Sequence, residues 1–130
     1  MTRIEAAIKD RLENGFKNWN GGYDSWLSWC NTLYDDASIY NVYGHRLTLK
    51  QYQNMMGDLF KKQDIKLGKF HNMIIADNWA AIRYDVEVTE IATGKTIVQQ
   101  SMEFVRFKET PEKGVIVDEG WATSTVPLSA

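Results

Sequence analysis

The amino-acid sequence opens with a helical pattern, in which apolar residues recur every three or four positions: Ile4, Ile8, Leu12, Phe16 and Trp19. Thr2 and Glu5 have the spacing of a capping box, which marks the start of this helix. Gly21-Gly22 then interrupts the pattern. A second short helix is predicted from Asp24, as its N-cap, to Leu33.

The rest of the chain predicts a short strand, a third helix and then a series of strands. Residues 37–43 predict a short strand and residues 44–46 a loop. Thr48 and Gln51 repeat the capping-box spacing at the start of a third helix. From there on, apolar and polar residues alternate as in half-buried strands, over residues 65–76, 79–90, 96–107 and 115–125. The predicted order is therefore helix, helix, strand, helix and four strands.

This order indicates the α+β class. Long antiparallel strands joined by short turns need one face covered, and only the helices are available to cover it. A strongly curved sheet wrapped around the N-terminal helices leaves a hollow, which is where a ligand is expected to bind. The 130 residues suit a single domain over residues 1–130.

Composition narrows the classes of partner. The net charge of −2 carries no block of like charge, which argues against nucleic acid and anionic lipid as partners. No run reaches the ~20 apolar residues that span a membrane, and the N-terminus has no apolar signal core, so a cytoplasmic protein is expected. The lone Cys30 predicts neither an internal disulfide nor a zinc site. Five Trp and six Tyr favour a large core, an aromatic-lined pocket or a dimer interface.

Four local runs, in this order, resemble the nuclear transport factor 2-like superfamily and, within it, the SnoaL-like polyketide cyclases. They are LYDDASIY at 33–40, ADNWAAIR at 76–83, TGK at 93–95 and VIVDEGW at 115–121. The resemblance extends over residues 4–125. It implies a cone-shaped, cystatin-like α+β barrel, a homodimer, and a small apolar molecule in the pocket. It implies no metal and no organic cofactor.

The short strand carries the first candidate contacts. Ketosteroid isomerase, of the same superfamily, has its catalytic Asp in the run after the double Asp, where this chain has Asn41. An amide cannot act as a carboxylate base, so Asn41 argues against that mechanism. Tyr40 and Asn41 are predicted substrate contacts, with ordinary hydrogen bonding at a strand end as the alternative.

Arg83 and Asp85 share one face of a predicted strand. Alternation places that face outside, because Tyr84 and its apolar neighbours take the other one. The resemblance implies the opposite, since limonene epoxide hydrolase has an Arg-x-Asp that points into its pocket. Strict alternation puts His71 on an apolar face with Met73, where it could exchange a proton near neutral pH. Asp85 and His71 are the predicted proton-transfer groups, with Arg83 as their electrostatic partner.

Glu103 is a further candidate carboxylate, because it shares a strand face with Ser101 and would have a raised pKa if buried. The alternative is an ion pair with Arg83 or Arg106. Trp121 is a predicted pocket contact, and it stands where the limonene epoxide hydrolase pattern would need a second carboxylate. That difference argues against epoxide hydrolysis.

The sequence thus predicts a SnoaL-like protein that binds a small apolar carbonyl compound and acts on it as a cyclase or isomerase by general acid/base catalysis. The alternative is a ligand-binding or dimeric scaffold module of the same fold without catalysis. An epoxide hydrolase or dehydratase is a weaker alternative. No glycine-rich phosphate loop, nucleophile elbow or His/Cys metal cluster points elsewhere.

Overall fold

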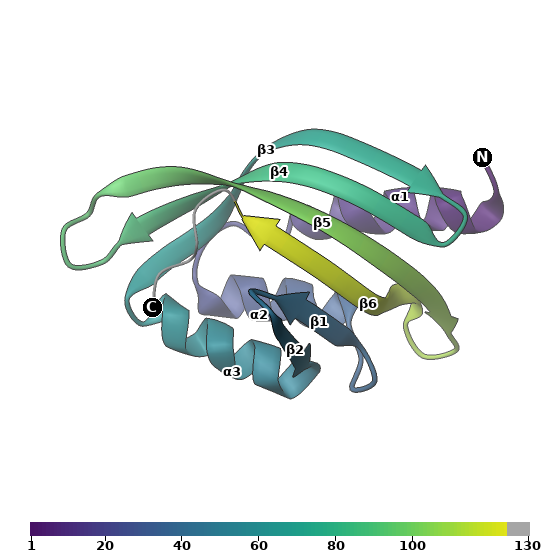
Figure 1. Cartoon of the computed structure of the whole chain (residues 1–130), viewed down its shortest axis with the longest axis horizontal. Coiled ribbons are helices and arrows are strands. Elements are labelled where there is room, and N and C mark those ends of the chain that lie inside the picture. The colour runs from purple at the N-terminus through teal and green to yellow at the C-terminus, as the bar shows by residue number, and fades with distance from the viewer. Residues whose placement is uncertain (125–130) are drawn as a thin grey trace.

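The computed structural model describes residues 1–124, which form three helices and one mixed sheet of six strands (Figure 1). The elements in chain order are α1 (Arg3–Phe16), α2 (Tyr23–Leu33), β1 (Ile39–Val42), β2 (His45–Thr48), α3 (Leu49–Phe60), β3 (Gln63–Ala76), β4 (Trp79–Glu90), β5 (Thr96–Thr110) and β6 (Gly114–Ser124). The final strand was predicted to reach residue 125, which lies outside the described residues. The predicted α+β class is confirmed.

The helix starts follow from side-chain capping at two of the three helices. At α1 the hydroxyl of Thr2 accepts the backbone N–H of Glu5, whose carboxylate in turn accepts the N–H of Thr2. Thr48 and Gln51 repeat the arrangement at α3. The predicted capping boxes are therefore both present.

The start of α2 differs from the prediction, because its N-cap is Gly22 and Asp24 lies inside the first turn. A tertiary contact explains the shift. The Gly22 N–H donates to the carboxylate of Asp64, 2.7 Å away on β3, at a φ of +81° that glycine adopts easily. At the C-terminal end of α2, the ammonium of Lys113 caps the helix. It donates hydrogen bonds to the carbonyls of Asn31 and Tyr34 at 2.8 and 2.7 Å.

The strand order across the sheet is β2-β1-β6-β5-β4-β3. Neighbouring strands are antiparallel except for β1 and β6, which run parallel. The sheet stays open rather than closing into a barrel, with β2 and β3 at its edges. Sequence reasoning missed β2 and predicted a loop over its first residues. Its four residues are almost all exposed, so they carry no apolar alternation.

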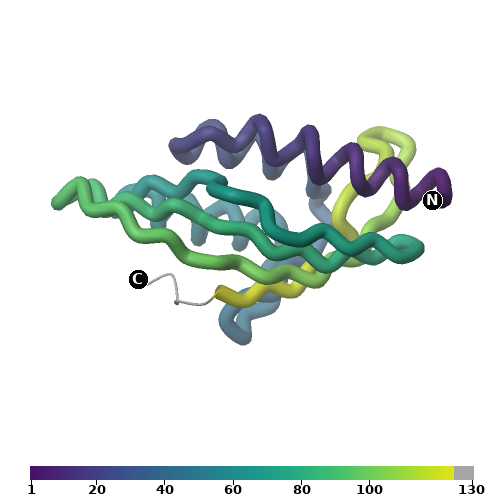
Figure 2. The backbone as a smooth tube through the Cα atoms, turned by 90° about the horizontal axis from the view of Figure 1, so that it is seen from above, coloured from purple at the N-terminus to yellow at the C-terminus, as the bar shows by residue number. Residues whose placement is uncertain are grey.

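The helices cover one face of the curved sheet, here called the inner face (Figures 1 and 2). On β4 the residues Ala80, Ile82, Tyr84, Val86 and Val88 are buried on this face. The helices contribute fully buried side chains such as Ile8 and Trp26, so the core lies between helices and sheet. The opposite, outer face of the sheet is not covered by any element of the described chain.

A β-bulge changes the two faces of β3. The register with β4 shifts between Leu67 and Phe70 and again between Phe70 and Asn72. Phe70 then lies opposite Tyr84, on the inner face. His71 follows Phe70 within the second shift, and its Nε2 lies 2.8 Å from Oδ1 of Asp85. Strict alternation, which placed His71 beside Met73, therefore does not hold through this part of β3, although both residues line the groove between α1 and β3.

Candidate functional site

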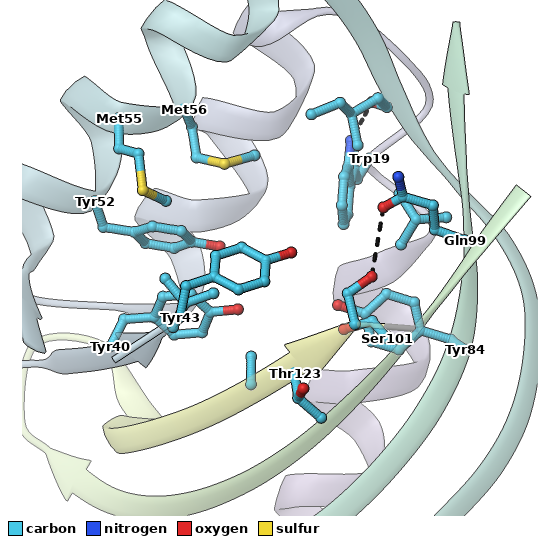
Figure 3. A pocket seen from close by; sticks show the side chains of 15 residues that line it. Trp19, Tyr40, Tyr43, Tyr52, Met55, Met56, Tyr84, Gln99, Ser101 and Thr123 are labelled. Atoms are coloured by element: carbon cyan, nitrogen blue, oxygen red, sulfur yellow. Dashed lines mark hydrogen bonds between the residues drawn. The ribbon is translucent and has the colours of Figure 1, made fainter. Parts of the chain in front are cut away.

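A cavity of about 60 Å³ lies inside the fold, between α3, the short strand β1 and the inner face of β4, β5 and β6 (Figure 3). Its wall is aromatic and apolar on the helical side and carries hydroxyl and amide groups on the sheet side. The lining residues are Trp19, Tyr40, Val42, Tyr43, Tyr52, Met55, Met56, Ile65, Tyr84, Val86, Gln99, Ser101, Ala122, Thr123 and Ser124. Figure 3 shows several of the tyrosine hydroxyls directed into this space.

A carboxyl group stands behind the sheet-side wall of the cavity. Tyr84 lines the cavity, and its hydroxyl donates a hydrogen bond to Oε2 of Glu103. Ser101 faces Tyr84 across the β4–β5 pair, lines the same cavity and also hydrogen-bonds Glu103. Two hydroxyl groups therefore connect the cavity to one acidic side chain.

Burial is the main cause that raises the pKa of Glu103, from 4.5 to about 7. Removal from water disfavours the charged form of a carboxyl group. The hydrogen bonds from Tyr84 and Ser101 act in the opposite direction and lower the pKa, but they only partly offset burial. Glu103 is thus close to half ionised near neutral pH, so it can both accept and return a proton.

Buried phenols surround this carboxyl. Burial first, and then the negative charge of Glu103, raise the pKa of Tyr34, Tyr40 and Tyr84 well above the ordinary tyrosine value. Tyr40 stacks on Tyr52 with ring centroids 4.1 Å apart, and burial likewise raises the pKa of Tyr52. All four phenols remain protonated near neutral pH. They are hydrogen-bond donors of the kind that stabilises a developing oxyanion.

Two of the predicted substrate contacts belong to this inner site and two do not. Tyr40 lines the cavity, and Glu103 lies directly behind Tyr84. Asn41 instead sits on the outer face, where its amide donates to the Glu119 carboxylate at 2.9 Å. Trp121 also points outward and is 37% exposed. One residue separates the inward Tyr40 from the outward Asn41, as strand alternation requires.

The two predicted proton-transfer groups, His71 and Asp85, meet near the β3 edge of the sheet. His71 Nε2 and Asp85 Oδ1 are 2.8 Å apart. Arg83 pairs with neither, because its guanidinium donates to Asn72 at 2.7 Å and Gln100 at 3.0 Å. None of the three lines the inner cavity. Their catalytic role stays a prediction, and it would now concern the groove of about 630 Å³ between α1 and β3 that His71 helps to line.

Sequence reasoning gave Tyr84 no part in proton transfer, although it counted Tyr84 among the aromatic residues that could line a pocket, and it assigned no role to Ser101 or Tyr52. Alternation along β4 and β5 does place Tyr84, Ser101 and Glu103 on one face of the sheet. A signal was therefore available: three polar side chains on an otherwise apolar face of two paired strands. Tyr52 gave no such signal, because a tyrosine in a helical apolar stripe has the same pattern as an ordinary core residue.

Within residues 1–124, no three His, Cys, Asp or Glu side chains gather closely enough to hold a metal ion. No helix in the described part of the chain has the length and apolar content needed to cross a membrane.

Comparison with known proteins identifies the fold. AclR, a candidate hydroxylase from Streptomyces galilaeus, matches with a TM-score of 0.75 at 17% identity, over 95% of this chain and 92% of that one. A candidate SnoaL-like polyketide cyclase from Jannaschia sp. CCS1 matches with a TM-score of 0.76 at 11% identity, over 96% and 90%. IdmH, a candidate polyketide cyclase from Streptomyces antibioticus, gives 0.64 at 12% identity, over 90% and 91%.

These matches confirm the resemblance in fold to candidate polyketide cyclases, a SnoaL-like one among them. A cystatin-like protein from Xanthomonas campestris, with a TM-score of 0.67 at 11% identity over 90% of this chain and 89% of that one, agrees. Comparisons with protein-family models and with curated protein sequences give no match. At such low identities the likeness concerns the fold alone, so the chemistry must be argued from the cavity.

Proposed function

We propose that the protein binds a small, largely apolar carbonyl compound in the inner cavity and moves a proton on it by cofactor-free acid/base catalysis. One observation carries the proposal: Tyr84 lines the cavity, and its hydroxyl hydrogen-bonds the carboxyl of Glu103. Similarity in fold to candidate polyketide cyclases supports this class of reaction, since a ring closure of the aldol type begins with loss of a proton beside a carbonyl.

In the proposed step, the Tyr84 hydroxyl oxygen takes a proton from the carbon beside the carbonyl and gives its own proton to ionised Glu103. The electron pair of the broken C–H bond moves onto the carbonyl oxygen and forms an enolate. The neutral phenols of Tyr40 and Tyr52 line the same cavity and can donate hydrogen bonds to that oxygen. Return of the proton to another carbon gives isomerisation, and attack of the enolate on a second carbonyl gives cyclisation.

The size of the cavity sets a condition on the ligand. About 60 Å³ is well below the ~300 Å³ of typical small-molecule pockets. A ligand larger than a few atoms therefore has to displace side chains. Met55 and Met56 on α3 form part of the wall, and methionine side chains change rotamer easily. The helical side of the cavity is thus the part that can widen.

Deuterium exchange tests the proposal without knowledge of the natural substrate. The small ketone 2-tetralone is incubated with the protein in D₂O, and exchange at the carbons beside its carbonyl is followed by NMR. We expect catalysed exchange in the wild type and a loss of at least tenfold in both Glu103→Gln and Tyr84→Phe. Val98→Thr, an exposed change on the outer face of β5, is the control and should exchange as the wild type does.

Equal exchange rates in wild type and Glu103→Gln would refute the proton-transfer role. The alternative function, a binding module without catalysis, predicts a different result. In that case 2-tetralone shifts the NMR signals of cavity residues such as Trp19 and Ser101. Deuterium exchange on the ketone is then no faster with wild type or any variant than in buffer alone.

A further inference from the structure

The turn between β1 and β2 places a large side chain in an unfavourable backbone conformation. Val42 pairs with His45, so that Tyr43 and Gly44 form a two-residue hairpin turn. Both have positive φ angles, +52° and +79°. Two-residue turns of this kind favour Asn-Gly or Gly-Gly, because short side chains tolerate the left-handed region.

The β3–β4 turn offers a direct comparison within the chain. Asp77 there has a φ of +54°, and it is one of the short polar residues that commonly adopt this conformation. A bulky aromatic residue at positive φ is an outlier. The turn geometry therefore does not explain why position 43 carries a tyrosine, whereas it does explain Gly44 and is compatible with Asp77.

The cavity provides the explanation for Tyr43. Its side chain is part of the cavity wall, and Figure 3 shows its hydroxyl extending over the space between the α3 methionines and the sheet. The residue is also 41% exposed, so it borders both the solvent and the cavity. A residue with both contacts stands at the mouth of the cavity.

We propose that Tyr43 covers the mouth of the inner cavity and contacts the bound ligand through the face of its ring, so that it determines which ligands are retained. This inference rests on the proposed function, because it assumes that the cavity is the ligand site. The ligand class it favours is a flat cyclic ketone. One face of such a ring can lie against Tyr43 while the carbonyl points toward the hydroxyl groups of the sheet side. Aromatic contact of this kind adds to the affinity beyond simple burial.

Two substitutions separate the ring from the turn. Tyr43→Asn creates the preferred Asn-Gly turn and removes the ring, whereas Tyr43→Phe keeps the ring and removes only the hydroxyl. Asp77→Asn is the matched control, because it changes the other left-handed turn residue at a site that does not line the cavity. The probe is 1-tetralone, and its binding is measured by NMR titration of wild type and variants, together with the melting temperature of each protein.

We expect Tyr43→Asn to bind 1-tetralone about tenfold more weakly, in line with the loss of one aromatic contact, while its melting temperature stays level or rises. Tyr43→Phe and Asp77→Asn should bind within twofold of wild type. If wild type binds in the cavity but Tyr43→Asn binds equally well, the role of Tyr43 is refuted and the ligand site stands. If wild type does not bind, the cavity is not the site and both proposals fail. A clear fall in melting temperature in Tyr43→Asn would show that Tyr43 serves the core instead.

Discussion

Replacing Glu103 with glutamine should change how the stability of the protein depends on pH. The pKa of Glu103 is about 7 in the folded protein, against 4.5 for an ordinary glutamate. Because the folded pKa is raised, the folded state holds its proton more tightly than the unfolded chain does. The contribution of Glu103 to stability is therefore fully present below about pH 4.5 and is lost as the pH rises toward 7.

The size of the effect follows from the two pKa values. A tenfold change in proton affinity corresponds to about 1.4 kcal/mol. The difference between the folded pKa of about 7 and the ordinary 4.5 therefore costs wild type about 3 kcal/mol of unfolding free energy between pH 4 and pH 8. Glutamine has the same shape and can still accept the Tyr84 hydroxyl, but it does not titrate. Glu103→Gln should lack this loss.

Urea unfolding followed by tryptophan fluorescence at several pH values between 4 and 8 measures the effect. The quantity of interest is the unfolding free energy of Glu103→Gln minus that of wild type, since the other titrating groups cancel in this difference. It should grow by about 3 kcal/mol across the range. Val98→Thr, an exposed change that adds and removes no titrating group, should give a flat difference. Parallel curves for Glu103→Gln and wild type would refute the view that burial raises the Glu103 pKa.

Three further predictions concern other parts of the molecule. Tyr84→Phe removes a hydrogen bond that lowers the pKa of Glu103, so this pKa should rise above the wild-type value of about 7. A ¹³C NMR titration of the Glu103 carboxyl measures it, and an unchanged midpoint would contradict the hydrogen bond between the two side chains. Lys113→Met removes the cation that caps α2 and should lower the unfolding free energy by about 1 kcal/mol, measured by urea unfolding. The predicted homodimer would cover Phe104 and Trp121, whose side chains are 55% and 37% exposed on the outer face. Replacing both residues with serine should therefore convert the dimer to a monomer, and light scattering measures this change. A wild-type protein that is already monomeric at micromolar concentration would contradict that prediction.

Most of the fold could be predicted because its signals are local. The capping residues Thr2 and Thr48 mark two helix starts in the sequence itself, and alternation marks the long strands. The errors arise where a distant residue decides the local structure. Asp64 fixes the start of α2 through the N–H of Gly22, some forty positions earlier in the chain. The bulge that brings His71 to Asp85 leaves no mark in an alternating pattern.

The candidate site was harder to predict, because its chemistry depends on which strand face lines the cavity. Alternation alone placed Arg83 and Asp85 outside, and the structure agrees. The resemblance to an Arg-x-Asp pattern implied the opposite, and it favoured Asp85 over Glu103 as the proton-transfer carboxylate. Burial of the Glu103 carboxyl arises from helices packing over the sheet, which the sequence of β5 alone does not show.

The energetics of Glu103 support the proposed catalysis. A cost of about 3 kcal/mol near pH 8 is a large share of the 5–15 kcal/mol that typically stabilises a folded domain. Glutamine would fit the same site, would keep the hydrogen bond to Tyr84 and would avoid this cost. A buried group that weakens the fold at neutral pH, and that two hydroxyl groups connect to a cavity, is the arrangement that proton transfer requires. The same burial therefore accounts for both the predicted loss of stability and the proposed catalysis, so the pH dependence of unfolding tests the physical basis of the function before any substrate is known.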